Sequence, residues 1–329
     1  METRCCVHIG LPKTGTKTLQ WHLFSQHSQV AYLGLFSGKI RRGHRRFKKC
    51  RDASIRAIMG EIGWGDDIFH PNIAGCKELF KRSVGPDLEQ GKVPIWSWES
   101  LALDVPEKRR ARAENLRRVF GPCRVFIAIR HPVDLMKSAY FQILRRENMN
   151  WANRKNLFGR YSYFFTVEQW LEKCFLGEIA PHLDYARTTQ IYADVFGKEA
   201  VSVFLFEDLK EEPSVFVKSV CELVGIDESE GVLLTREKRE NVRWTSEQVE
   251  RLRRIDQSII KKWRFHFAPR RLRLRMIGIG SYFEPGTGPR FKVDIPKVWQ
   301  DRIAERTREG NRWLAKEWKL PLEKYEYPL

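Results

Sequence analysis

The sequence predicts an α/β fold in which helices cover both sides of a central parallel sheet. Three short apolar runs, residues 5–9, 123–129 and 201–206, are typical of strands buried on both faces. Each run leads into a turn and then into a segment with the apolar spacing of a helix. The chain has 329 residues, 42% of them hydrophobic, which is enough to fill the core of one α/β domain with insertions. We therefore expect a single domain over residues 1–329.

The first strand and helix, residues 7–24, are joined by a polar turn that contains Gly10 and Gly15. A strand, a short loop and a helix in this order direct backbone N–H groups and the positive helix end at one small volume, which suits a phosphate. The spacing departs from a Walker A loop, because Thr16 separates Gly15 from Lys17. An ordinary turn that caps a helix is the structural alternative.

Residues 25–92 are the least regular part of the chain. They are rich in glycine, and residues 39–51 hold eight Lys or Arg. We expect either a lid that faces a substrate or a solvated surface excursion.

Residues 93–99 are expected to form the second strand and end in Glu99. Ligands of an open parallel sheet lie outside the carboxyl ends of its strands, so Glu99 is expected near the first loop. Its carboxylate could accept a proton from a hydroxyl or an amine. A helix-capping or ion-pairing role for Glu99 fits the sequence equally well.

A basic helix over residues 106–120 precedes the central strand at 123–129, which ends in Arg130. Pro132 stands where a helix begins, and Ser138 lies nearly two turns into it. Arg130 and Ser138 could both bind one phosphate, the first by a charge-assisted pair and the second through its hydroxyl.

The two motifs together resemble one enzyme family. Residues 12–18, PKTGTKT, resemble the 5′-phosphosulfate loop of sulfotransferases that use PAPS (3′-phosphoadenosine-5′-phosphosulfate). The pattern R-x-P-(x)5-S-x-Y at residues 130–140 resembles their 3′-phosphate motif. Both occur in the order of the family, at the expected strand ends. The resemblance, to the bacterial or carbohydrate type, implies a P-loop-like three-layer sandwich with a central parallel sheet and helical insertions.

The resemblance also implies roles for individual residues. Lys13 would stabilise the leaving phosphate and Glu99 would be the general base. A late basic loop, residues 237–242, resembles the family segment that closes over the nucleotide, although Arg243 and Trp244 stand where that pattern usually has Ser. The implied PAPS-binding residues are Lys13, Thr14, Gly15, Thr16, Lys17, Thr18, Arg130, Ser138, Lys238 and Arg239, with no metal ion.

The remaining elements are expected as helices over residues 167–175, 185–196, 213–224, 246–260 and 296–318. Asp208, just after the strand at 201–206, is expected to brace the structure. Residues 261–276 alternate basic and apolar side chains. They form either a surface that binds an anionic acceptor or membrane headgroups, or a basic connector whose aromatic side chains pack on the core.

The formal net charge of +18 favours anionic partners. No motif for specific nucleic-acid recognition accompanies it. The seven cysteines are scattered without metal-ligand spacing, and no apolar run is long enough to span a membrane. We expect a cytoplasmic protein without a secretory leader, and peripheral membrane contact stays open. Residues 25–92, 141–185 and 261–290 are expected to face the acceptor.

Two other functions fit parts of the sequence. A nucleotide-dependent kinase would need a lysine directly after Gly15 and an aspartate that ends a strand, and Asp208 suits that role poorly. A non-catalytic basic module for glycans or acidic membranes would need only the charge. The leading expectation is sulfuryl transfer from PAPS to a hydroxyl or amine of an acceptor, with a carbohydrate favoured.

Overall fold

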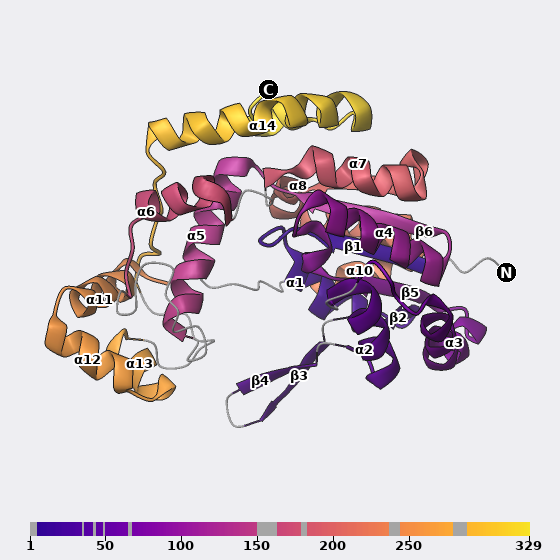
Figure 1. Cartoon of the computed structure of the whole chain (residues 1–329), viewed down its shortest axis with the longest axis horizontal. Helices are drawn as coiled ribbons and strands as arrows, with labels where there is room; N and C mark the ends of the chain where they lie inside the picture. The colour runs from indigo at the N-terminus through magenta and orange to yellow at the C-terminus, as the bar shows by residue number, and fades with distance from the viewer. Residues whose placement is uncertain are drawn as a thin grey trace. The chain divides into compact units, whose positions relative to one another are not determined.

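The computed structural model describes residues 5–34, 36–41, 44–48, 50–64, 68–149, 163–178, 183–236, 244–278 and 288–329. The chain folds as two compact units, and Figure 1 labels most of their helices and strands. The first unit comprises Met1–Pro132, Ala180–Arg239 and Ala304–Leu329, and the second comprises Val133–Ile179 and Glu240–Ile303. The single-domain organisation and the acceptor-facing insertions stay predictions.

The first unit is built on a five-stranded sheet whose order is β2-β5-β1-β6-β7. All neighbouring strands are parallel, as predicted. In this order they are β2 (Val30–Tyr32), β5 (Val93–Ser97), β1 (Cys5–Gly10), β6 (Cys123–Ile129) and β7 (Val201–Leu205). β1 is central, and β5 and β6 flank it. Because the strands are parallel, the segments that follow β1, β5 and β6 leave the sheet at the same edge.

Helices cover both faces of this sheet. On one face, side chains of the π-helical segment Leu19–Phe24, which continues α1 (Thr16–Thr18), and of α9 (Pro213–Val224) form a core with Cys6, Ile95 and Phe126. On the other face, Trp96 contacts Phe120 of α4 (Pro106–Phe120), with ring centroids 5.2 Å apart. Helices α3 (Ile73–Glu89) and α7 (Tyr185–Phe196) pack beside α4. The predicted three-layer α/β sandwich is therefore confirmed.

The range 25–92 holds more regular structure than the sequence suggested. It contributes β2 to the central sheet, so the strand at 93–97 is not the second in chain order. It also holds an antiparallel hairpin of β3 (Phe36–Arg41) and β4 (His44–Lys48), and the helix α2 (Ala53–Met59). The remaining helices of the unit are α8 (Phe206–Glu211) and α10 (Glu228–Thr235). A three-residue strand is too short to show a two-residue periodicity in the sequence.

The second unit is helical in its described residues. It contains α6 (Val167–Lys173), α11 (Ser246–Asp256), α12 (Ile259–Phe267) and α13 (Arg270–Met276). Two longer helices, α5 (Pro132–Met149) and α14 (Lys297–Trp318), have residues in both units. The single helix expected over 246–260 is wrong, because α11 ends at Asp256 and the Ser258 side chain caps α12 by accepting from the Lys261 N–H. By contrast, the helices predicted over 106–120, 185–196 and 213–224 have the predicted bounds.

Candidate active site

At two positions, the tight turn between β1 and α1 needs a backbone conformation with positive φ, which most residues avoid. Lys13 (φ 76°) and Gly15 (φ 81°) both adopt left-handed conformations. A Cβ on Gly15 would lie 2.3 Å from a methyl carbon of Leu209, and one on Gly10 would lie 2.6 Å from the Thr16 hydroxyl oxygen. Glycine is therefore required at 10 and 15, and the chain can enter the helix directly after the turn.

Two threonine side chains hold this loop together. Thr14 is fully buried, and its hydroxyl donates to the Leu11 carbonyl oxygen at 2.6 Å. The hydroxyl of Thr16, which is 2% exposed, lies 3.3 Å from the same oxygen. The Thr18 N–H donates to the Gly15 carbonyl oxygen at 2.9 Å and so begins the helix. Contacts of these threonines with a phosphate stay predictions, but their hydroxyls already fix the loop that would make them.

Glu99, which follows β5, lies at this loop. Burial raises the pKa of its carboxyl above the ordinary value, whereas the Lys17 and Lys13 ammonium groups lower it, as does a hydrogen bond with the Thr16 side chain. The net direction is upward, so desolvation outweighs the two cations. The sequence-predicted pair Lys13 and Glu99 is therefore brought together, with Lys17 beside it.

Arg130, which follows β6, is also at the loop. Arg130 is only 6% exposed, and its Nη1 donates to the Lys13 carbonyl oxygen at 3.1 Å. The guanidinium stacks over the Phe206 ring at 4.6 Å, and the Tyr185 hydroxyl donates to the Arg130 carbonyl oxygen at 2.8 Å. Both sides of Arg130 are thus fixed, which directs one cation at the Lys13 end of the loop.

Three further residues, Ser138, Lys238 and Arg239, are predicted to contact a phosphate. Ser138 is half-buried on α5 in the second unit, and its role stays a prediction. Lys238 and Arg239 lie outside the described residues. Asp208 accepts a hydrogen bond from the Tyr325 hydroxyl at 2.6 Å, in line with the bracing role expected for it.

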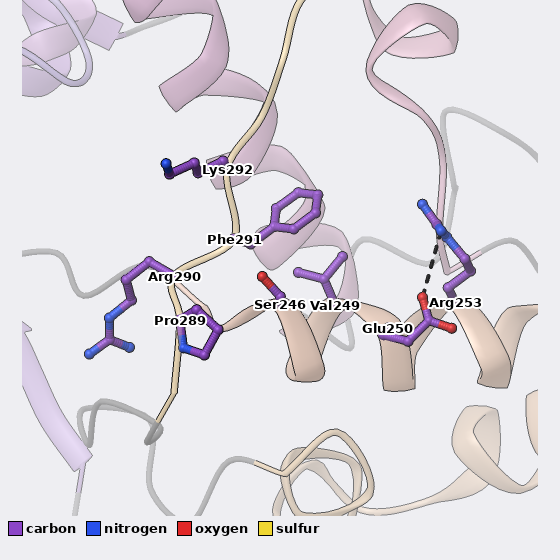
Figure 2. A pocket seen from close by; sticks show the side chains of 8 residues that line it. All are labelled: Ser246, Val249, Glu250, Arg253, Pro289, Arg290, Phe291 and Lys292. Atoms are coloured by element: carbon purple, nitrogen blue, oxygen red, sulfur yellow. Dashed lines mark ion pairs between the residues drawn. The ribbon is translucent and has the colours of Figure 1, made fainter.

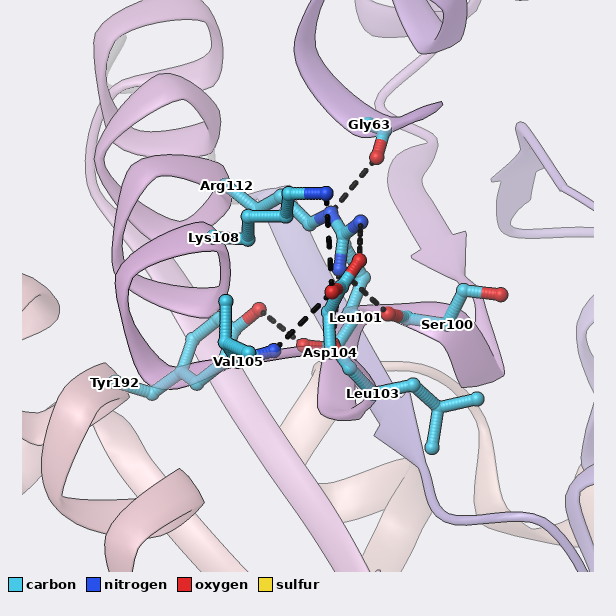
Figure 3. Close-up of polar contacts among 9 residues, drawn as sticks. All are labelled: Gly63, Ser100, Leu101, Leu103, Asp104, Val105, Lys108, Arg112 and Tyr192. Carbon is cyan, nitrogen blue, oxygen red and sulfur yellow. Dashed lines mark hydrogen bonds and ion pairs between the residues drawn. The ribbon is translucent and has the colours of Figure 1, made fainter. Parts of the chain in front are cut away.

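Arg112 of α4 braces the turn that carries Glu99, a role that the sequence did not reveal. Figure 3 shows its guanidinium surrounded by backbone oxygens. Nε donates to Gly63 at 2.8 Å, and Nη1 donates to Ser100 at 3.2 Å and to Leu103 at 2.9 Å. Nη2 pairs with the Asp104 carboxylate at 2.9 Å. These contacts hold both ends of the 3₁₀ turn that starts at Glu99. Within that turn, the Leu101 carbonyl oxygen accepts a hydrogen bond from the Tyr192 hydroxyl at 3.2 Å.

A second buried network lies along β1 and β5. His8 Nδ1 lies 2.7 Å from Ser97 Oγ, and Gln20 Nε2 donates to the same oxygen at 3.0 Å. The His8 ring stacks on Phe126, with centroids 4.2 Å apart, and burial lowers the pKa of His8 to about 3. His8 is therefore neutral at physiological pH and serves as a polar support rather than as a cation.

One signal in the sequence could have identified Arg112. Arg109, Arg112, Leu116 and Val119 recur at helical spacing and are all buried. An arginine on the apolar face of a helix is almost never buried without partners. The spacing that Arg109 and Arg112 share with Leu116 and Val119 predicts that both arginines lie on the buried face of the basic helix, but it does not identify their partners.

The second unit contains a groove of about 460 Å³ with cationic and apolar walls (Figure 2). Arg253 in its wall pairs with Glu250 at 3.6 Å. The lining residues are Ser246, Val249, Glu250, Arg253, Pro289, Arg290, Phe291 and Lys292.

Comparison with known families decides the assignment of the chain. The model of the sulfotransferase domain matches residues 6–274, which include the loop, Glu99, Arg130 and Ser138. The chain belongs to the sulfotransferase family. A search of curated proteins finds no match.

One solved sulfotransferase named here supports the fold. The crystal structure of a sulfotransferase from Alicyclobacillus acidocaldarius aligns over 99% of both chains with a TM-score of 0.53 and 14% identity, a level that supports the fold alone. The sulfotransferase STF9 from Mycobacterium avium aligns over 85% of this chain and 78% of its own, with a TM-score of 0.41 and 14% identity. The second likeness is too weak to carry an argument.

The described residues also bear on two other kinds of site. Within them, no group of three or more His, Cys, Asp or Glu side chains could hold a metal ion. Among the same described residues of this sulfotransferase-family chain, no helix has the length and apolar character needed to cross a membrane.

Proposed function

We propose that this sulfotransferase moves a sulfuryl group from PAPS to a hydroxyl or amine of an acceptor. The observation that carries the proposal is the meeting of Lys13, Glu99 and Arg130 at the carboxyl ends of three adjacent parallel strands. Two cations at a tight loop suit a nucleotide with two separate anionic groups, a 3′-phosphate and a 5′-phosphosulfate, and the carboxylate suits an acceptor proton. When bound, PAPS supplies the activated sulfuryl group, and 3′,5′-ADP is the leaving group.

Lys13 is the residue assigned to the leaving phosphate. Its backbone conformation and the Arg130 contact with its carbonyl oxygen fix where the side chain begins. A preplaced ammonium group stabilises charge that develops on a bridging oxygen, at little cost in reorganisation. The loop N–H groups and the Thr18 hydroxyl are assigned to the 5′-phosphate, as the start of a helix favours an anion.

Arg130 and Ser138 are assigned to the 3′-phosphate, with Lys238 or Arg239 as further contacts. The Nη1 donor of the planar Arg130 guanidinium bonds to the Lys13 carbonyl oxygen, which holds the group at this loop. Arginine is suited to bidentate binding of a phosphate that ATP lacks at this position.

Glu99 is assigned as the general base. Desolvation raises its pKa and makes its ionised form a stronger proton acceptor, while Lys13 and Lys17 favour ionisation. Such a balance suits proton removal from an acceptor, because a general base becomes more efficient as its own pKa approaches the working pH.

The proposed acceptor is a carbohydrate or another anionic molecule. The net charge of +18 supports an anionic partner. The groove with Arg253, Arg290 and Lys292 offers cations beside the apolar surface of Phe291, a combination that suits a sugar with acidic groups.

The test is calorimetric titration of the protein with 3′,5′-ADP and, separately, with ATP, each with EDTA and again with magnesium. Metal-independent binding of 3′,5′-ADP alone is the expected result, and it would justify a screen of acceptors with PAPS. Binding of ATP alone in the presence of magnesium would replace the proposal with a kinase. If neither nucleotide binds, the proposed use of PAPS is wrong and a non-catalytic basic module takes its place.

A further inference from the structure

One face of α12 leaves large apolar side chains in solvent. Ile259, Ile260, Trp263 and Phe267 are 76%, 73%, 56% and 60% exposed. Their spacing places them on one side of the helix, within about one third of its circumference. Trp263 and Phe267 stack with ring centroids 5.3 Å apart. The exposed residues are therefore a continuous stripe rather than scattered side chains.

The opposite face of the same helix is anchored in the second unit. Phe265 is fully buried and meets the Tyr163 ring edge-on at 4.9 Å, with the Arg273 guanidinium 5.9 Å from its centroid. The Tyr163 hydroxyl lies 2.6 Å from Nδ1 of His266, within hydrogen-bond distance. Because this side is packed and hydrogen-bonded, the fold itself turns the apolar stripe outward.

The charge around the stripe has one sign. Residues 259–276 contain seven Lys or Arg and no Asp or Glu. Lys261, Arg264, Arg271 and Arg275 are exposed, and Leu272 of α13 adds a half-exposed apolar side chain. The acids of neighbouring α11 face its own arginines, and Asp256 pairs with Lys262 at 3.6 Å. The stripe is thus an apolar band set among cations.

We propose that this α12–α13 surface, defined by Ile259, Ile260, Trp263, Phe267, Leu272 and the cations between them, docks on an anionic lipid bilayer. A helix with aromatic and aliphatic side chains on one face and Lys or Arg beside them lies in the headgroup plane. The nine residues of α12 span only about 14 Å at 1.5 Å per residue, far less than a bilayer core, so the helix rests on the membrane.

Charge and apolarity together select this partner over two others. A soluble polyanion would satisfy the cations but leave the stripe in water. A second copy of the chain would cover the stripe but bring two positive surfaces together. An anionic membrane accepts both, since headgroups neutralise the cations and the interface takes the apolar side chains.

The test measures co-flotation of the full chain with vesicles of phosphatidylglycerol and phosphatidylcholine in equal parts, and with vesicles of phosphatidylcholine alone. We expect binding to the mixed vesicles that weakens with added salt. The double substitution Ile260→Ser and Trp263→Ser should weaken it roughly 10- to 100-fold, because two interfacial anchors are lost. Lys261→Gln with Arg264→Gln should weaken it roughly 25-fold, about fivefold per charge.

The matched control is Leu233→Ser, which removes a side chain 70% exposed on α10 of the first unit and should leave vesicle binding unchanged. Thermal unfolding of all variants reports that the fold is intact, and the result is independent of the proposed reaction. The proposal fails if the wild-type chain does not float with the mixed vesicles, or if the Ile260/Trp263 variant floats equally well.

Two further outcomes would assign a different partner to the α12–α13 surface. An Ile260/Trp263 variant that turns a dimer into a monomer in light scattering, with vesicle binding unchanged, would make the surface an interface between copies. A wild-type chain that binds dextran sulfate but neither kind of vesicle would make it a site for a soluble polyanion.

Discussion

At the loop after β1, the cations are held by oxygens of the protein itself, whereas on the α12–α13 surface they stand among exposed apolar side chains. Arg130 is buried and bonded to the Lys13 carbonyl oxygen, and Arg112 is bonded to three carbonyl oxygens nearby. Lys261 and Arg264 are exposed on a short helix. The same excess of charge thus serves two purposes. A fixed cation can recognise one ligand geometry, while exposed cations attract any anionic surface and are screened by salt.

Glu99→Gln should have the largest effect on the fixed region. Turnover should fall about 10²–10⁴-fold, because glutamine cannot accept the acceptor proton. The 3′,5′-ADP affinity from calorimetry should be nearly unchanged. Glu89→Gln, an exposed change on α3, is the control. Unchanged turnover would leave Glu99 with only the structural bond to Thr16.

Arg130→Ala should weaken 3′,5′-ADP binding roughly 10- to 100-fold, since charge-assisted hydrogen bonds to the 3′-phosphate are lost. Binding of adenosine 5′-phosphosulfate, which has no such phosphate, should weaken much less. Calorimetry with both ligands measures the difference. Equal losses would mean that Arg130 acts only by shaping the loop through the Lys13 carbonyl oxygen.

Arg112→Lys tests whether the brace under Glu99 matters to the chemistry. Lysine keeps the charge but cannot reach four acceptors in one plane, so kcat should fall about 10-fold. The free energy of unfolding should drop by about 1–3 kcal/mol for the carbonyl oxygens left unpaired. Affinity for 3′,5′-ADP should persist. Arg110→Lys, on the exposed side of α4, is the control, and a stability loss without a change in kcat would limit Arg112 to a structural role.

The smallest expected effect is a change in how the free energy of unfolding depends on pH. Since the folded-state pKa of Glu99 lies above its unfolded value, ionisation opposes folding. The wild-type chain without nucleotide should therefore lose stability as pH rises through the folded pKa, relative to Glu99→Gln. The free energies of unfolding of the wild-type chain and of Glu99→Gln should converge at pH values below the ordinary pKa of a glutamate. Urea unfolding across pH measures this, and a gap that widens towards low pH would contradict it.

The sequence predicted the parts of the molecule that follow from simple periodicity. The helix from Pro106 to Phe120 has a proline at its first position and Gly121 beyond its last residue, and its bounds were predicted correctly. The β2 strand was missed because three residues are too few to show a periodicity, and the hairpin of β3 and β4 was missed because its basic sequence lacks an apolar pattern.

The same division holds at the candidate site. The meeting of the loop, Glu99 and Arg130 follows from a parallel sheet, in which strand ends share one edge. The inward turn of Arg112 and the His8–Ser97 hydrogen bond depend on packing between elements far apart in the sequence. A local pattern can place Arg112 on the buried face of its helix, but it does not encode these distant partners.

Lys13 stands in a backbone conformation that glycine adopts freely and a lysine adopts at a cost of roughly 1–2 kcal/mol. Lys13→Gly should therefore unfold at a higher temperature while turnover is largely lost. Selection for stability alone would then remove the side chain assigned to the leaving phosphate. Under laboratory evolution, a screen that rewards only soluble expression would drift towards well-folded, inactive chains by this one substitution, and retention of the lysine would report that turnover is being selected.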